Sequence, residues 1–108
     1  MSLMDIIPES FARCALLYLE KEKVIGIGFP WYLAKTNSSF ADAIVKLGFA
    51  NSKSEARNKI KQKSVSFNDF LVDNTLSLLK QEEFWKIRTN VRMGLLRCGN
   101  NAGIIELL

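Results

Sequence analysis

The sequence predicts an α+β domain in which a helical hairpin packs on a small, mostly antiparallel sheet, with an extra helix at the N-terminus. Three observations predict this class. Residues 40–47 have apolar side chains at helical spacing, residues 65–72 alternate as paired strands do, and 48% of the 108 residues are hydrophobic. A chain of this length and composition forms one domain and can bury a core.

Residues 1–38 are interpreted as a cloning scar, an N-terminal helix and a linker. The residues before the second methionine, Met4, are typical of a cloning scar. Pro8 suits the first position of a helix, which we expect to run to about Lys23. The predicted buried face of this helix contains Phe11, Ala15, Tyr18 and Leu19.

The segment between this helix and residue 39 is predicted to be irregular. Glycine and proline interrupt residues 24–30, which predict a short strand or loop. Residues 31–37 are interpreted as a connector without a predicted shape.

Residues 39–108 are interpreted as the main part of the domain, and they begin with two short helices. Ser39 with Asp42 resembles a capping box, and Gly48 suits the left-handed residue that ends a helix. Ser52 with Glu55 forms a second capping box, which opens a helix toward residue 63. The predicted apolar residues of the two helices are Phe40, Ala43, Ile44 and Leu47 in the first and Ala56 and Ile60 in the second.

After the second helix, the spacing of apolar side chains changes from the period of a helix to the alternation of a strand. Val65 and Phe67 alternate with serines, Asn68-Asp69 is a tight-turn dipeptide, and residues 70–72 begin a return strand. The last expected strands are residues 84–88 and a terminal hairpin formed by residues 95–98 and 104–107.

Positive charge is concentrated in the second half of the chain. Residues 1–50 carry five basic and five acidic side chains, whereas residues 51–108 carry ten basic and six acidic ones. An asymmetry of this kind favours an anionic partner for the second half.

The second helix carries most of this excess. Lys53, Arg57 and Lys61 are spaced four apart and share one face, and Lys59 and Lys63 are predicted to form a second row. Like charges stacked in this way repel slightly, so stability alone does not explain them. Ser52 and Ser54 place hydroxyl and backbone donors at the helix N-terminus, which favours a phosphate. The alternative is an ordinary solvated helix.

Several enzyme classes lack their usual residues. The chain has no histidine, and its two cysteines, Cys14 and Cys98, lack the close spacing of metal or redox motifs. Glu82-Glu83 are adjacent, which does not suit a paired-carboxylate site. Gly26-Ile27-Gly28 lacks the third glycine of a dinucleotide-binding loop. We expect a non-catalytic chain without a cofactor or metal, in a reduced, cytoplasmic setting. No apolar run is long enough to span a bilayer.

Residues 40–69 resemble the RNA-binding domain named after the fourth small-subunit ribosomal protein. That family has a helix ending in Leu-x-Gly, then Ser-Arg/Lys-Ser-Glu-Ala-Arg, a basic run, Ile-x-x-Gly and Val-x-Val/Ile-Asn-Gly. Two glycines of the pattern are replaced here, by Lys63 and Asp69. The residues that match by identity or type are Ser52, Lys53, Ser54, Glu55, Ala56, Arg57, Ile60, Val65, Phe67 and Asn68.

Residues 75–108 are similar to the end of bacterial-type tyrosyl-tRNA synthetases, whose final hairpin has an Arg-Arg-Gly-Lys-Lys-like tip. Here residues 96–101 take that place, and asparagines replace the two lysines. The resemblance implies a C-terminal domain that positions tyrosine tRNA for a catalytic domain missing from this chain. That parent enzyme would use ATP and Mg²⁺ in its catalytic domain and form a homodimer through it. The implied RNA-binding residues are Ser52, Lys53, Ser54, Arg57, Lys59, Lys61 and Lys63, with Arg88, Arg92 and Arg97 as a second patch.

Three alternatives remain at the level of the sequence. The chain could be a ribosome-associated or rRNA-binding member of the same RNA-binding family, or an appendage of a pseudouridine synthase, although nothing here resembles the catalytic domain of that enzyme. In a different class, it could be a protein-interaction module whose first helix and Trp31 region dock on a partner while the basic helix is merely solvated.

Overall fold

The computed structural model of the protein describes residues 8–108, so the predicted cloning scar lies outside the described residues. The helices are α1 (Glu9–Leu19), α2 (Lys21–Gly26), α3 (Phe40–Lys46) and α4 (Lys53–Lys61). The strands are β1 (Trp31–Ala34), β2 (Val65–Phe67), β3 (Phe70–Leu71), β4 (Trp85–Arg88), β5 (Val91–Cys98) and β6 (Asn101–Leu107), and a 3-10 helix spans Gln81–Glu83. None of the helices in the described range is long and apolar enough to cross a membrane.

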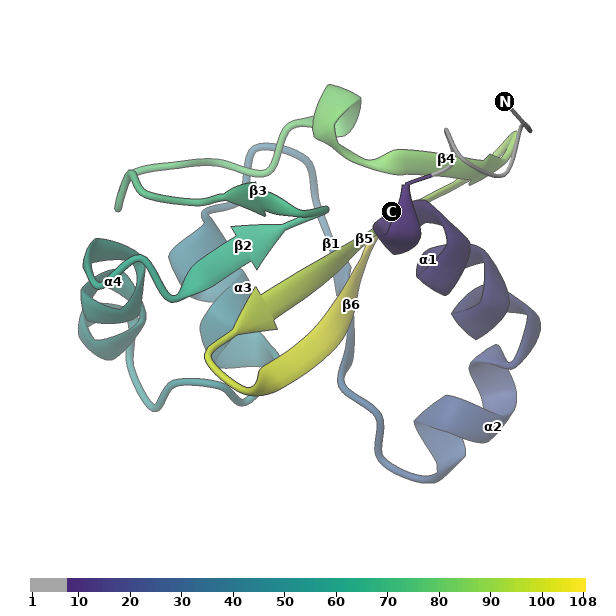
Figure 1. Ribbon diagram of the computed structural model, residues 1–108, viewed down its shortest axis with the longest axis horizontal. Helices are drawn as coiled ribbons and strands as arrows, with labels where there is room; N and C mark the ends of the chain where they lie inside the picture. Colours follow the sequence, from purple (N-terminus) through teal and green to yellow (C-terminus); the bar gives the residue numbers. More distant parts are fainter. Residues whose placement is uncertain (1–7) are drawn as a thin grey trace.

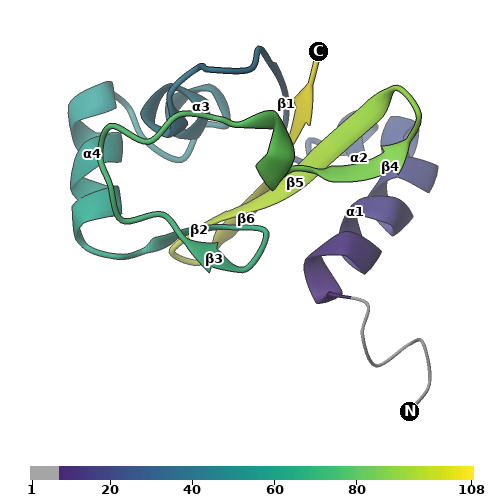
Figure 2. The same ribbon diagram turned by 90° about the horizontal axis from the view of Figure 1, so that it is seen from above.

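The strands form one sheet with helices on both faces, which confirms the α+β prediction (Figure 1). The strand order is β1-β6-β5-β2-β3, and β4 pairs with β5 outside this path. All pairs are antiparallel except β1 with β6. Helices α3 and α4 cover one face and α1 covers part of the other, as the view from above shows (Figure 2).

The N-terminal segment differs from the prediction in two ways. The expected single helix ends at Leu19, and a second helix, α2, continues from Lys21 through residues predicted to be a strand or loop. Residues 31–34, which belong to the connector whose shape was not predicted, form β1 and pair in parallel with β6. The partner of β1 lies about 70 positions further along the chain, so no local pattern of the connector could reveal the pairing.

The buried face of α1 also differs from the predicted one. Ser10 and Cys14 are fully buried, with Leu17 and Tyr18 packed beside Cys14, whereas Leu19 is 80% exposed. Ser10 is tolerated in this position because its hydroxyl accepts a hydrogen bond from the indole of Trp85 at 3.0 Å. The sheet, rather than the sequence pattern of α1, therefore selects which side of the helix is buried.

The predicted hairpin of two helices is present, with both predicted caps. The Ser39 hydroxyl accepts a hydrogen bond from the backbone N–H of Asp42 at 3.0 Å. The Ser52 hydroxyl accepts one from the N–H of Glu55 at 3.1 Å. Between the helices Gly48 has a φ of +87°, the left-handed conformation expected after a helix end.

The core on the α3–α4 side is centred on Phe67 of β2. Its ring packs edge-on against Phe40 of α3, with centroids 5.3 Å apart, and against Phe84, with centroids 4.8 Å apart. Gly94 on β5 makes room for this ring, because a Cβ at that position would lie 1.9 Å from Cζ of Phe67. The contact joins the helical hairpin to the centre of the sheet.

The terminal hairpin is longer than predicted. β5 and β6 stay paired from Arg92 with Leu107 to Cys98 with Asn101, so only residues 99 and 100 remain for the turn. The sequence predicted a loop through Gly103, because residues 99–103 favour turns. In the structure Gly103 is buried against Pro30 and Leu47, the residue after α3, and a Cβ there would lie 3.0 Å from the Cβ of Pro30.

The two positions where the resembling family has glycine are left-handed in this protein. Lys63, after α4, has a φ of 60°, and Asn68 and Asp69, between β2 and β3, have φ values of 50° and 72°. The Asn68 side chain fixes the second turn by donating to the carbonyl of Glu83 and accepting from the N–H of Leu95, both at 2.8 Å. The backbone therefore follows a glycine-type path, although neither residue at these two positions is glycine.

Candidate nucleic-acid interface

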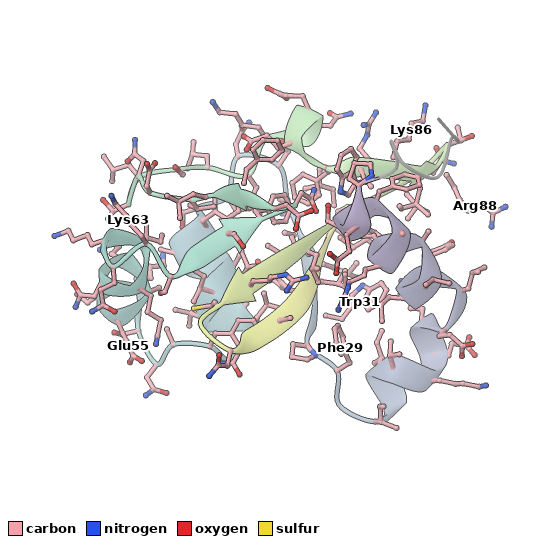
Figure 3. All side chains as sticks on the ribbon, in the orientation of Figure 1. Phe29, Trp31, Glu55, Lys63, Lys86 and Arg88 are labelled. Carbon is pink, nitrogen blue, oxygen red and sulfur yellow. The ribbon has the colours of Figure 1, made fainter. Side chains whose placement is uncertain are left out.

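Helix α4 lies on the domain through a narrow apolar stripe. Ala56 and Ile60 are both 0% exposed and are the buried residues of this helix. Lys53, Arg57 and Lys61 are exposed, and Lys59 is half-buried. The fold therefore presents the basic side chains of α4 on its outer side, at the end of the molecule marked by Glu55 and Lys63 in Figure 3.

The basic side chains lie on both flanks of this stripe. At about 100° per residue, Arg57 and Lys61 lie on one side of Ala56 and Ile60, and Lys59 lies on the other. Lys59 is near Cys98, the last residue of β5: burial raises the pKa of the Cys98 thiol, and the Lys59 ammonium opposes that rise. The predicted row of Lys59 with Lys63 does not exist as a helical row, because α4 ends at Lys61 and the chain turns at Lys63.

Most of these charges have no carboxylate partner. Lys53 Nζ lies 4.0 Å from a carboxylate oxygen of Asp42 on α3. Within residues 8–108, the four other basic side chains form no ion pair: Arg57, Lys59, Lys61 and Lys63. Their positive charge is therefore available to an anion in solution.

The N-terminus of α4 is partly used by its own cap. The Ser52 hydroxyl accepts from the N–H of Glu55, and the Glu55 carboxylate accepts from the N–H of Asn51 at 3.2 Å. The first-turn N–H groups of Lys53 and Ser54 remain, for which helix geometry supplies no partner. The predicted donors at this end are the backbone N–H groups of residues 53–54 and the hydroxyls of Ser52 and Ser54, since the Ser52 hydroxyl can donate while it accepts from Glu55.

The second predicted patch is not a single patch. Arg92 and Arg97 lie on β5 five positions apart, so they point to opposite faces about 16 Å from each other. Arg88 is at the far end of the molecule from Lys63, as Figure 3 shows. Of the three arginines, Arg97 lies nearest the end of β5 where Cys98 is near Lys59, but its side chain points to the sheet face opposite to α4.

Glu9 on α1 was not predicted to belong to the site. Its Oε1 lies 3.0 Å from Nε of Arg13 and 3.8 Å from Nη2 of Arg97. The charge spacing within α1 could indicate the pair with Arg13, four residues away. No sequence signal connects Glu9 with Arg97, because the sheet alone brings these distant residues together.

Outside the basic side of α4, the described residues include two buried cysteines and a surface hollow. Cys14 and Cys98 are free and buried, and burial raises the pKa of Cys14 to about 12. Residues 8–108 contain no group of three or more His, Cys, Asp or Glu side chains placed to hold a metal ion. A surface hollow of about 630 Å³ lies beside α2 and Glu106, on another part of the surface from the basic side of α4.

The comparisons with known proteins do not add a family to this description. No protein-family model matches the chain, and no curated protein matches it.

Proposed function

We propose that this domain binds structured RNA through the outer side of α4, and that its partner is transfer RNA. The observation that carries the proposal is the set of four basic side chains without an ion pair within residues 8–108: Arg57, Lys59, Lys61 and Lys63. Neutralising phosphates with lysine and arginine supplies most of the affinity of such surfaces.

The shape of the site favours recognition of a backbone over reading of bases. Lysine and arginine flank the stripe of Ala56 and Ile60 on both sides, so they can contact phosphates on either side of the helix. The deep major groove of A-form RNA does not admit side chains, and phosphate contacts fix position without reading sequence. We therefore expect selectivity for RNA shape at α4.

The transfer RNA assignment extends the resemblance to the C-terminal domains of bacterial-type tyrosyl-tRNA synthetases. Support comes from the helical hairpin, the left-handed backbone at Lys63 and Asp69, and the terminal β5–β6 hairpin. In this role the domain would position tyrosine tRNA in the cytoplasm. Tyrosine activation with ATP and Mg²⁺, and dimer formation, would belong to a separate catalytic domain.

A titration with three RNAs tests the proposal. The purified chain is titrated with transcribed tyrosine tRNA, a non-cognate tRNA and a fragment of ribosomal RNA at several salt concentrations. Tighter binding to tyrosine tRNA, with a clear salt dependence, is expected. Equal binding to all three would favour the ribosomal alternative, and binding without a salt dependence would refute the RNA proposal.

One observation favours a second candidate, a protein-interaction module. Leu16, Leu19 and Ile27 on and after the N-terminal helices are 64%, 80% and 86% exposed, so this segment presents apolar side chains that a protein partner could cover. This candidate predicts that the chain fails to bind any of the three RNAs and that charge changes on α4 have no effect on its partner.

A further inference from the structure

Within residues 8–108, no helix covers part of the sheet face that is opposite to α3 and α4. Met93 and Leu95 of β5 pack with Ile104 and Cys14 beneath α1. Arg97 lies two positions after Leu95, so it points to the same face. Figure 1 views the sheet from this side: α1 covers one end, and β2 with the adjoining ends of β5 and β6 has no helix in front.

Arg97 is at the centre of a row of residues across this open surface. It pairs with Ala102 of β6 on one side and with Ser66 of β2 on the other, and Ser66 pairs in turn with Leu71 of β3. The Arg97 side chain is 41% exposed, Leu71 is 50% exposed, and the other two are half-buried. The row is thus an accessible surface with a single guanidinium at its centre.

This row is close to the basic end of α4. Ser66 follows Lys63 by three residues, a span of at most about 11 Å. The hairpin also contacts the end of α4, because the N–H of Gly99 donates to the carbonyl of Ser64, whose hydroxyl donates to the carbonyl of Lys59. Arg97 faces away from the helical hairpin, so a nucleic-acid strand that contacts Lys63 must pass around the end of the sheet at residues 64–66 to reach it.

Glu9 holds Arg97 in the RNA-free protein only weakly. The carboxylate is 66% exposed and is shared by two guanidinium groups, at 3.0 Å from Arg13 and 3.8 Å from Arg97. An exposed ion pair of this kind contributes little to stability, so another anion can replace it. A phosphate is a suitable replacement, because guanidinium groups bind its oxygens with two parallel hydrogen bonds.

On the basis of the proposed function, we propose that the RNA-contacting surface extends from α4 across the open sheet to Arg97, and that a phosphate displaces Glu9 there. In the wild-type protein the phosphate only replaces the Glu9 carboxylate at Arg97, so this contact adds little to the affinity for RNA. Removing the Glu9 charge makes Arg97 available and removes the repulsion of the incoming phosphate. Glu9 therefore sets the affinity of this part of the surface.

The test compares Glu9→Gln with Glu22→Gln in titrations with transcribed tyrosine tRNA. Both variants gain the same net charge, but Glu22 is on α2 and forms no ion pair within residues 8–108. We expect Glu9→Gln to bind about threefold to fivefold more tightly at low salt. Its salt dependence should increase by about one phosphate contact. Glu22→Gln should change neither quantity.

Combining Glu9→Gln with a second substitution, Arg97→Ala or Arg13→Ala, identifies the arginine through which Glu9 acts. The gain from Glu9→Gln should disappear in Arg97→Ala and persist in Arg13→Ala, with thermal unfolding of each variant showing that it is folded. Suppose that the wild type binds RNA with a salt dependence. Equal affinities of Glu9→Gln and Glu22→Gln, or a gain that persists in Arg97→Ala, would then overturn this inference and leave the proposed function intact. Absence of salt-dependent binding by the wild type would overturn the proposed function as well.

Discussion

Replacing Arg57 and Lys61 of α4 by glutamine tests the proposed interface most directly. Both side chains are exposed, lie on the same flank of the helix and have no ion pair within the described residues. Because they are like charges four residues apart, their removal should change the stability of the helix by only a few tenths of a kcal/mol. A loss of RNA binding would then report a loss of contacts and not unfolding.

The size of the effect follows from the number of unpaired charges. If Arg57, Lys59, Lys61 and Lys63 each contact one phosphate of a duplex, log K should fall with log salt with a slope of about −3.6. Raising salt from about 50 to 200 mM then weakens binding by about 150-fold. With two contacts left, the slope should be about −1.8 and the loss about twelvefold.

The assay is a titration of tyrosine tRNA at four or more salt concentrations within that range. The matched control is Lys35→Gln with Lys86→Gln, which removes two exposed charges outside α4; Lys86 is at the opposite end of the molecule in Figure 3. The control should keep the wild-type slope. An equal drop in slope for both double variants would refute the assignment to α4, since it would show that only net charge matters.

Three further predictions concern stability. Gly94→Ala should lower the free energy of unfolding by about 2–3 kcal/mol in urea titrations, because its Cβ would lie 1.9 Å from Cζ of Phe67; a loss below about 1 kcal/mol would contradict the packing. Asp69→Gly should raise it by about 0.5–1 kcal/mol, because φ of 72° strains an L residue; lower stability would contradict this. Burial, with a smaller effect of Asp69, raises the pKa of Cys14 from 9.0 to about 12, so the unfolded thiol ionises first and stability should fall as pH rises from 9 toward 12. Between pH 8 and pH 10 the free energy of unfolding of Cys14→Ala should fall by roughly 1 kcal/mol less than that of the wild type. An equal fall in both proteins would refute the linkage to Cys14.

Local patterns predicted the helical hairpin well. Ser39 and Ser52 cap the helices as expected, and Gly48 is left-handed, because capping depends on residues within one turn of each other. Ala56 and Ile60 are buried as predicted, since each helix has one apolar side.

The same reasoning failed where distant strands decide the structure. β1 exists because β6 pairs with it, and its four residues carry no sign of that partner. The buried side of α1 depends on Met93, Leu95 and Ile104 of the sheet, which contact Cys14 and leave Leu19 in solvent. Pairing and packing between distant segments are not encoded in the spacing within either segment.

The sequence by itself determined the composition of the candidate site: a basic helix with two apolar anchors, opened by a serine cap. Helix periodicity fixes which side chains flank the anchors, so Arg57 and Lys61 could be assigned to one flank before the fold was known. Only the tertiary structure decided that Arg97 is near this end of the molecule, that Arg88 and Arg92 are not, and that Glu9 faces Arg97. The physical reason is that electrostatic interactions act through space, and the sheet register sets those distances independently of separation along the chain.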